Sequence, residues 1–348
     1  MTGIENVVIR KAIVHKVGNP SRGEGLALSI NALTLNDGLV EKMLTRYFLN
    51  SINEQELHNF THLSDINLNE VFTYISAIFR EEKNFVTSSK NIAEFLYSKS
   101  THVKVKEGEL CVMMLDNVPF ENDFVQAVGI FKSESKETFL KVLQHGQSLE
   151  LVPEDGISVS KPDKACLVFN IAASEGFKVC VLDHTNKQQE AQYWITDFLH
   201  VEPIANSYHH TDKYLSMCKQ FVTNEYAGKF EVERSDQLEM LNRSMDYFKT
   251  HDQFNLDEFT GEVIHHPEVV DSFILYKKNF ESARNYEIED DFDINLSAVK
   301  KQQKFFKSVL KLDKNFHIYI HGRRDLIEKG TDQQTGKKYY KIYFEEES

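Results

Sequence analysis

Basic residues gather in one segment near the end of this 348-residue chain. The segment from Lys300 to Lys341 carries twelve lysines and arginines and four acidic residues, which gives it a charge of +8. The chain as a whole has a net charge of −13, so everything outside this segment sums to −21. Ammonium and guanidinium groups bind phosphate oxygens, and a basic segment on an acidic chain attracts a polyanion to one surface. The alternative is a solvated, lysine-rich surface that has no ligand.

A helix is expected to position the first of these side chains. Ser297–Lys311 has helical spacing, and four of its lysines recur at i, i+4, i+7 and i+11, which places them in one stripe. Val299, Phe306 and Leu310 lie on another face and can pack against the rest of the protein. The residues that we expect to contact phosphates are Lys300, Lys301, Lys304, Lys307, Lys311, Arg323, Arg324, Lys337, Lys338 and Lys341.

A β-ribbon is expected to position the remaining basic side chains. Asn315–His321 alternates as a strand, and Leu326–Lys329 and Lys337–Phe344 flank the loop Gly330–Gly336 as a hairpin. One face of its second strand holds Tyr339, Lys341 and Tyr343, and the other holds Lys338, Tyr340, Ile342 and Phe344. Lysines interleaved with tyrosines suit phosphate contact together with stacking on sugars or bases. The alternative is an amphipathic hairpin with its last two apolar residues in the core and its lysines in solvent.

Histidines and cysteines provide the best candidates for a metal site, and we expect none. The strongest group is His200, His209, His210, Asp212 and Cys218. Its spacing does not match a closed zinc set, and adjacent histidines point to different sides of a helix or strand. The four cysteines lie far apart, so we interpret each as a small apolar residue in a reducing compartment. No cofactor is expected.

Catalytic motifs are absent from the sequence. It contains no G-x-S-x-G, no P-loop and no G-x-G-x-x-G. Asp183 and His184 could act as an acid–base pair at the end of a strand, although an Asp-His at that place is more often a turn. We therefore expect no catalytic residues.

The rest of the chain predicts an α+β fold: an N-terminal antiparallel sheet with helices, a helical middle region, and a C-terminal basic helix with a β-hairpin. Residues 7–17 and 26–30 predict a hairpin, and later strands, among them Ser148–Val152, continue the sheet. The expected domains are 1–186, 187–295 and 296–348, the last packed on the second. The acidic stretch Glu287–Asp293 is interpreted as a solvated linker or a screen for the basic helix.

Composition limits the location and the class of ligand. No window approaches the ~18 apolar residues of a membrane-spanning helix, and the N-terminus lacks the pattern of a signal peptide. We therefore expect a cytoplasmic protein without membrane contact. An overall pI near 5.6 argues against a protein that coats DNA over its whole surface.

Several segments carry a resemblance to a known family. They are SSKNIAEFLYSKSTHVKVKEGELCV (88–112), QYWITDFLHVEPIANSYHHTDKYLSMCKQF (192–221), FNLDEFTGEVIHHPEVVDSF (254–273), INLSAVKKQQKFFKS (294–308) and FHIYIHGRRDLIEKGTDQQTGKKYYKIYF (316–344). Their order and spacing resemble the bacterial 37-kDa nucleoid-associated protein family. The resemblance implies a non-enzymatic cytoplasmic protein that co-localises with the bacterial chromosome and binds nucleic acid. We expect double-stranded DNA as the partner, and the sequence leaves the preference for DNA over RNA, protein partners on the chromosome and oligomerisation open.

Three hypotheses follow. The first is a nucleoid-associated DNA-binding protein that contacts phosphates through its C-terminal basic surface. The second is a protein-interaction regulator of DNA-bound machinery with weak DNA affinity of its own, in which the acidic part of the chain makes the contacts. The third is an enzyme with a site around His184 and His209.

Overall fold

The structure, a computed structural model, describes residues 4–35, 37–49, 52, 56–157, 162–184, 192–284, 286–306, 309–312, 315–319 and 326–346. The chain forms two compact units, Met1–Ile204 (unit 1) and Ala205–Ser348 (unit 2). Both combine helices with antiparallel strands, so the α+β prediction is confirmed. In the described ranges no helix is long and apolar enough to cross a membrane.

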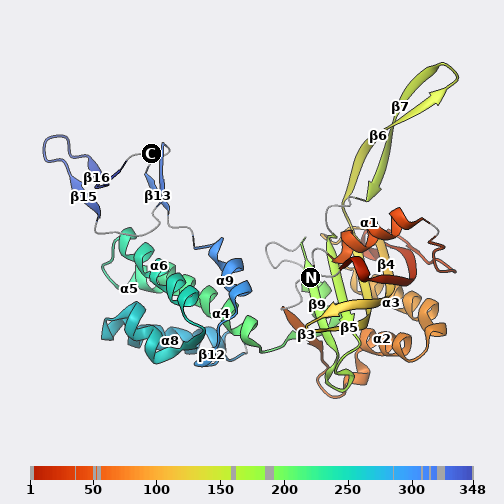
Figure 1. The fold of residues 1–348 in the computed structure, drawn as a ribbon, viewed down its shortest axis with the longest axis horizontal. Helices are drawn as coiled ribbons and strands as arrows, with labels where there is room; N and C mark the ends of the chain where they lie inside the picture. Colours follow the sequence, from red (N-terminus) through yellow and green to blue (C-terminus); the bar gives the residue numbers. More distant parts are fainter. Residues whose placement is uncertain are drawn as a thin grey trace. The chain divides into compact units, whose positions relative to one another are not determined.

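Unit 1 is built around an eight-stranded antiparallel sheet (Figure 1). The strand order is β10-β3-β9-β8-β5-β4-β1-β2. The bounds are β1 Val8–Val17, β2 Leu26–Ala27, β3 Leu57–Phe60, β4 Gly108–Phe120, β5 Asp123–Ser133, β8 Lys164–Phe169, β9 Lys178–Asp183 and β10 Val201–Pro203. The predicted hairpin near the N-terminus is confirmed by the pairing of β1 with β2.

Both faces of this sheet are covered. Val112 and Met113 are neighbours on β4, yet they belong to the cores on opposite faces, as the two-residue repeat of a strand requires. Helices α2 (Glu70–Arg80) and α3 (Phe85–Lys99) cover the first face, and α1 (Gly38–Leu49) covers the second. The strands at the centre are therefore apolar on both sides.

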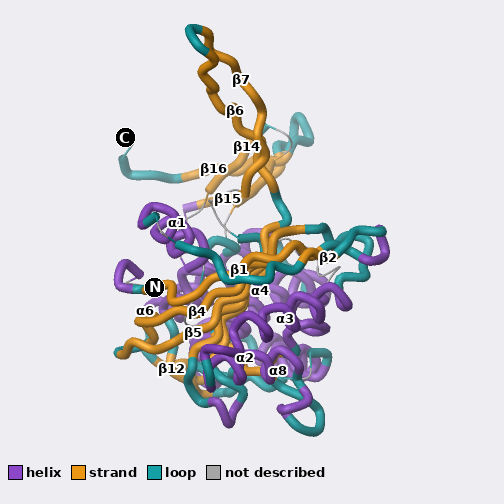
Figure 2. The backbone as a smooth tube through the Cα atoms, turned by 90° about the vertical axis from the view of Figure 1, so that its right-hand side faces the viewer, coloured by secondary structure: helices purple, strands orange, loops and turns teal. Residues whose placement is uncertain are grey.

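A long hairpin leaves unit 1. Strands β6 (Lys136–His145) and β7 (Ser148–Ile157) form a separate two-stranded sheet, which we call the arm. Figures 1 and 2 show it projecting away from the sheet of its unit. The prediction that Ser148–Val152 continues the large sheet is wrong, because this segment pairs with β6. The alternation of apolar and polar residues in this segment is that of a half-buried strand, but most side chains of β7 are exposed.

Unit 2 is mainly helical and has an aromatic core. Tyr214 lies at its centre, with ring centroids 4.1 Å from Phe254, 5.8 Å from Phe259 and 6.2 Å from Phe273. The elements are α4 Ser207–Gln220, α5 Ala227–Lys229, α6 Arg234–Thr250, β11 Gln253–Asn255, α7 Leu256–Phe259, α8 Pro267–Ser282, β12 Asp291–Asp293, α9 Leu296–Gln303, β13 Val309–Leu312, β14 Phe316–Tyr319, β15 Ile327–Thr331 and β16 Lys338–Ile342. Short π-helical turns, Phe221–Tyr226 and Thr260–Ile264, follow α4 and α7.

The acidic stretch before α9 is part of this fold, so its interpretation as a linker is wrong. β12 pairs with β11 in antiparallel fashion. Asp290 lies 2.9 Å from the ammonium group of Lys277, which is buried and also donates to Glu281 and to the carbonyl of Ile288. Asp290 of this stretch, together with Glu281 of α8, therefore neutralises a buried lysine of α8.

The basic helix is shorter than its sequence pattern predicts. It ends at Gln303, and Val309–Leu312 forms the strand β13, paired with β14. The prediction that four lysines form a single stripe along one helix is therefore wrong. The cause is tertiary: Phe306, three residues past the helix, is buried in the core of unit 2, and the backbone that follows is paired with a second strand.

Candidate nucleic-acid interface

Helix α9 is fixed on α4 by polar contacts. The backbone N–H of Asn295 donates to Thr211 Oγ1 at 3.0 Å, and the Gln302 amide donates to Asp212 Oδ1 at 2.8 Å. Asn295 also caps α9 through its side chain, which accepts from the N–H groups of Ser297 and Ala298. The buried side of α9 thus faces α4, and Lys300 lies on the exposed side.

The expected basic residues divide into groups. Lys300, Lys304, Lys337 and Lys338 are exposed and form no ion pair with another residue that the structure describes. The first two lie at the C-terminal end of α9, where cations are favourable to the helix dipole. Three expected residues, Lys307, Arg323 and Arg324, lie outside the described residues, and so does the side chain of Lys311, whose backbone belongs to β13.

Lys301 is already neutralised. Its ammonium nitrogen lies 3.4 Å from Asp212 Oδ1 and 5.4 Å from the centroid of the Tyr208 ring. The ammonium group that would contact a phosphate thus already interacts with a carboxylate and with an aromatic ring. Among the expected residues, Lys301 therefore has less free charge to offer than Lys300.

The hairpin of β15 and β16 presents one of its faces openly. Tyr339 and Tyr343 are exposed, and the Lys341 ammonium lies 4.7 Å from the Tyr343 ring centroid. Tyr340, on the other face, packs against the core of unit 2. Gly330 makes room for the Tyr339 ring, since a Cβ atom there would lie 2.3 Å from Tyr339 Cζ. The alternative with the last two apolar residues in the core is wrong, because Ile342 and Phe344 are exposed.

A second contact ties this hairpin to the helical part of unit 2. The ammonium group of Lys329 donates to Glu233 Oε1 at 2.7 Å, and Glu233 is the N-cap residue of α6. In the loop, Asp332 Oδ1 accepts from the N–H groups of Gln334 and Thr335. The loop therefore holds Lys337 and Lys338 at the start of β16.

Sequence reasoning missed several exposed aromatic residues. Phe305, Phe316 and Tyr319 all expose their rings, next to or between basic positions. The Lys219 ammonium lies 5.4 Å from the Phe305 ring centroid, so α4 adds a lysine that we did not expect. The sequence did indicate one exposed ring, because the adjacent residues Phe305 and Phe306 at the end of a helix cannot both face the core.

The histidine group predicted not to bind metal contains buried residues. His210 is buried, and burial lowers the pKa of its imidazole, with Glu289 opposing. Asp212 accepts from Gln302, and burial raises the pKa of the Cys218 thiol. Within the described part of the chain a different trio comes together: ligand atoms of His251, Glu258 and Glu262 lie within 4.8 Å of one another.

This trio could receive a divalent cation, but its own contacts account for it. His251 Nε2 lies 3.8 Å from Glu262 Oε2, and Glu258 accepts from the Tyr247 hydroxyl at 3.0 Å. Burial raises the pKa of that tyrosine to about 12, so it remains a donor. Glu258 and Glu262 are exposed carboxylates, and each already has a partner in Tyr247 or His251. Neither carboxylate therefore needs a metal ion.

Protein purified without added metal is expected to contain no stoichiometric zinc or manganese, as measured by elemental mass spectrometry. The physical reason is that the candidate ligands are buried, paired or exposed acids. One equivalent of metal that disappears in His251→Ala, or in a His209→Ala/His210→Ala double variant, would contradict this expectation and would identify the site.

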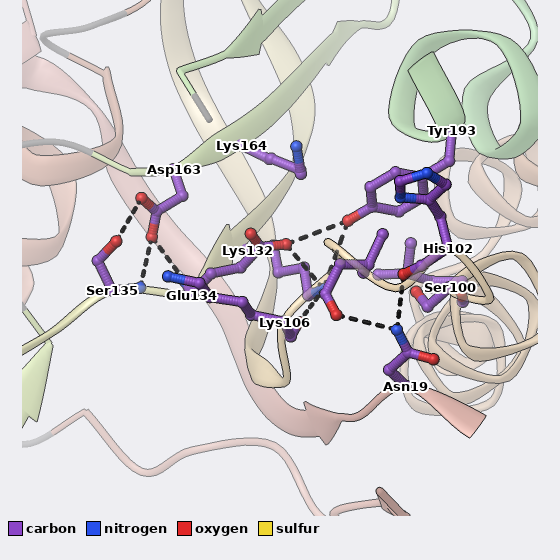
Figure 3. Close-up of polar contacts among 12 residues, drawn as sticks. Asn19, Ser100, His102, Lys106, Lys132, Glu134, Ser135, Asp163, Lys164 and Tyr193 are labelled. Carbon is purple, nitrogen blue, oxygen red and sulfur yellow. Dashed lines mark hydrogen bonds and ion pairs between the residues drawn. The ribbon is translucent and has the colours of Figure 1, made fainter. Parts of the chain in front are cut away.

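Unit 1 contains a buried ionic network (Figure 3). Lys132 and Lys164, both buried, lie 5.8 and 5.1 Å from the centroid of the Tyr193 ring. Lys132 donates to Glu134 Oε1 at 2.9 Å, and Lys164 donates to Asp183 Oδ1 at 2.7 Å. Burial lowers the pKa of Lys132 and raises that of Tyr193, whereas Glu134 acts against the shift of the lysine. Asp183 thus stabilises a buried cation, which favours a structural role over the acid–base role.

The comparison with known families places the chain in a class. Residues 13–336 match the family model described as nucleoid-associated protein YejK, so the chain is of the nucleoid-associated class. The chain belongs to this family, and the resemblance found in the sequence is confirmed. A comparison with curated proteins finds no match.

Proposed function

We propose that this nucleoid-associated protein binds double-stranded DNA, without catalysis, through the basic and aromatic segment 300–344 of unit 2. The observation that carries the proposal is the exposure of Lys300, Lys304, Lys337 and Lys338 without ion-pair partners among the described residues. Exposed aromatic rings accompany them. Because the rest of the chain sums to −21, a polyanion is attracted to this segment and repelled elsewhere.

Phosphate contact accounts for the affinity in this proposal. Each lysine that neutralises a phosphate releases condensed counterions, so the affinity falls as salt rises. With about four to six phosphates neutralised, the slope of log K against log salt is roughly −4 to −5. Such contacts position the protein on DNA without reading its sequence.

The exposed rings supply a second kind of contact. Tyr339 and Tyr343 lie on the face that also holds Lys341. Rings beside lysines suit stacking on sugars or on unstacked bases. Any preference for AT-rich DNA is assigned to Arg323 and Arg324, because a narrow minor groove attracts arginine side chains.

The difference between Lys304 and Lys301 tests the proposal at single residues. Lys304→Ala is expected to flatten the salt slope by about one unit and to weaken AT-rich and GC-rich duplexes alike. Lys301→Ala is expected to change the slope much less, because Asp212 already neutralises that ammonium group. Fluorescence anisotropy over a salt series measures both. Equal slopes for wild type and Lys304→Ala would contradict the phosphate contact.

A second candidate function is favoured by the acidity of the chain. With −21 outside the basic segment, a large acidic surface is available to basic partner proteins on the chromosome. In that case the protein regulates DNA-bound machinery and has little DNA affinity of its own. The same anisotropy series separates the two candidates, since the second predicts only weak binding even at low salt.

A further inference from the structure

Exposed aromatic rings gather in the C-terminal segment of unit 2. In the described part of the chain eight phenylalanine and tyrosine side chains are exposed, and six of them belong to residues 305–344. The six are Phe305, Phe316, Tyr319, Tyr339, Tyr343 and Phe344. The other two, Phe124 and Phe139, lie in unit 1. Apolar side chains scattered singly over a surface need no explanation, but a group within one segment indicates a binding surface.

The hairpin of β15 and β16 is held by one face, which leaves its other face open. Tyr340 packs against the core of unit 2, and Lys329, its cross-strand partner, donates to Glu233 at 2.7 Å. Side chains alternate along a strand, so Tyr339 and Lys341 point away from that core, and both are exposed. The open face therefore has a defined direction relative to the helices of unit 2.

The Tyr339 ring lies across this hairpin. Gly330 is its cross-strand partner, and a Cβ atom on Gly330 would lie 2.3 Å from Tyr339 Cζ and 2.4 Å from Tyr339 Oη. The ring thus occupies the space that a side chain at position 330 would fill, and it remains 48% exposed. We call the Tyr339 ring with Gly330 beneath it the platform. Because the ring is already supported on one side, it loses little conformational entropy when a second aromatic ring stacks on it.

Cations beside the platform select the kind of ring that can bind. Lys341 lies two residues further along the same face, with its ammonium group 4.7 Å from the Tyr343 ring centroid. Its ion-pair partner Glu328 is 4.0 Å away, and both side chains are exposed, so a phosphate can replace this carboxylate at little cost. Lys338 begins the same strand. An aromatic surface next to phosphate-binding cations fits a nucleic-acid base and its phosphate.

An intact duplex cannot use the platform, because its bases are stacked on one another. Stacking of one base on an aromatic side chain is worth roughly 5- to 150-fold in affinity. Taking a paired base out of the duplex stack offsets this gain, whereas a base that is already unpaired needs no such step. The platform therefore adds affinity only where bases are unpaired.

We propose that this protein binds double-stranded DNA that contains a short unpaired stretch in preference to intact duplex. An unpaired base stacks on Tyr339, and Lys341 contacts the adjoining phosphate. The preference does not depend on which base is present, because every base has a π-face. This inference rests on the proposed DNA binding, in which the other lysines contact phosphates of the flanking duplex.

Two duplexes of equal length and charge test the preference, one intact and one with a short run of mismatched central pairs. Anisotropy titrations of the full-length protein are expected to give about tenfold or tighter binding to the mismatched duplex relative to the intact one. Tyr339→Leu is expected to lower this ratio about fivefold or more, and Tyr339→Phe is expected to preserve it, because stacking needs the ring and not the hydroxyl. The affinity that Tyr339→Leu loses is expected to be the same at every salt concentration, because stacking releases no counterions.

Gly330→Ala tests the geometry without changing an aromatic residue. Its Cβ atom displaces the Tyr339 ring, so the ratio is expected to fall as in Tyr339→Leu. Phe124→Leu is the matched control, because it removes a ring of unit 1 that is 60% exposed, and it is expected to keep the ratio of wild type. Tyr340 still anchors the hairpin in all these variants.

The outcomes separate this inference from the proposed function. Equal affinity for the two duplexes would overturn the inference and leave DNA binding in place, and the exposed rings would then serve a partner other than DNA. Binding of neither duplex at low salt would overturn both. A ratio that stays at the wild-type value in Tyr339→Leu or Gly330→Ala, or that falls in Phe124→Leu to the same extent, would overturn the assignment to Tyr339.

Discussion

Replacing Lys300, Lys304, Lys337 and Lys338 together by glutamate is expected to abolish DNA binding near physiological salt. Each of these lysines is exposed and without an ion pair in the described part of the chain. Loss of about four phosphate contacts removes most of a salt slope of roughly −4 to −5, and the four new carboxylates add repulsion. A gel-shift or anisotropy titration against a random-sequence duplex measures the loss, which we expect to exceed 100-fold, in keeping with the ~10³–10⁵-fold salt sensitivity of multi-phosphate binders.

The control must separate position from net charge. Lys42, Lys83, Lys249 and Lys278 are also exposed, and their replacement by glutamate changes the net charge by the same amount. This control is expected to weaken binding far less. An equal loss in both variants would mean that only the overall charge matters, and would contradict a C-terminal interface.

Substitutions are a better test than truncation at Lys300. Gln302 and Phe306 lie beyond that point, and both are buried in unit 2. A chain that ends at residue 299 would lose the contact between Gln302 and Asp212 as well as part of the core. Its failure to bind DNA would therefore reflect unfolding as much as loss of the basic residues.

The second large effect is expected in the pH dependence of stability. His15 is 1% exposed, and its Nδ1 accepts from the backbone N–H of Ser29 at 3.1 Å, so its Nε2 carries the proton and donates to Ser89 Oγ at 3.2 Å. Burial, with a contribution from Lys90, lowers the pKa of this imidazole to about 4. A second proton would have to sit on Nδ1, against the Ser29 N–H.

The unfolded chain binds this proton near pH 6.5, whereas the folded protein does not until about pH 4. Stability is therefore fully present above pH 6.5 and falls as the pH is lowered toward 4. Between pH 7 and 5 the free energy of unfolding is expected to drop by about 1–2 kcal/mol through this residue. Urea titrations at both pH values measure the drop.

His15→Gln should remove this pH dependence, because an amide can still accept from Ser29 and donate to Ser89 without titrating. His62→Gln, at an exposed histidine, controls for the loss of an imidazole elsewhere. A His15→Gln variant that loses as much stability as wild type between pH 7 and 5 would show that other groups cause the effect.

Long strands of the large sheet, such as β1, were predictable from sequence because their apolar pattern is extended and their surroundings are supplied by the same unit. Local pattern failed in 297–311, where helical spacing continues to Lys311 but the helix ends at Gln303. The strand β13 depends on pairing with β14, and the end of the helix depends on a core that receives Phe306. Both are tertiary effects that spacing along the chain does not encode.

The candidate interface was likewise predictable only where local sequence pattern decides the structure. Exposure of Lys300 and Lys304 follows from the apolar spacing of α9, but the neutralisation of Lys301 depends on Asp212 in a helix nearly ninety residues earlier. The arm is the clearest case: the alternation of Ser148–Val152 predicts one covered face, yet most side chains of β7 are exposed.

The salt dependence of DNA binding by the wild-type protein tests the central claim most directly. Anisotropy titrations of the full-length chain with AT-rich and GC-rich duplexes, over a series of salt concentrations, give log K against log salt. The account predicts a straight line of slope roughly −4 to −5 for both duplexes. A salt-independent affinity, or no binding at the lowest salt, would contradict it.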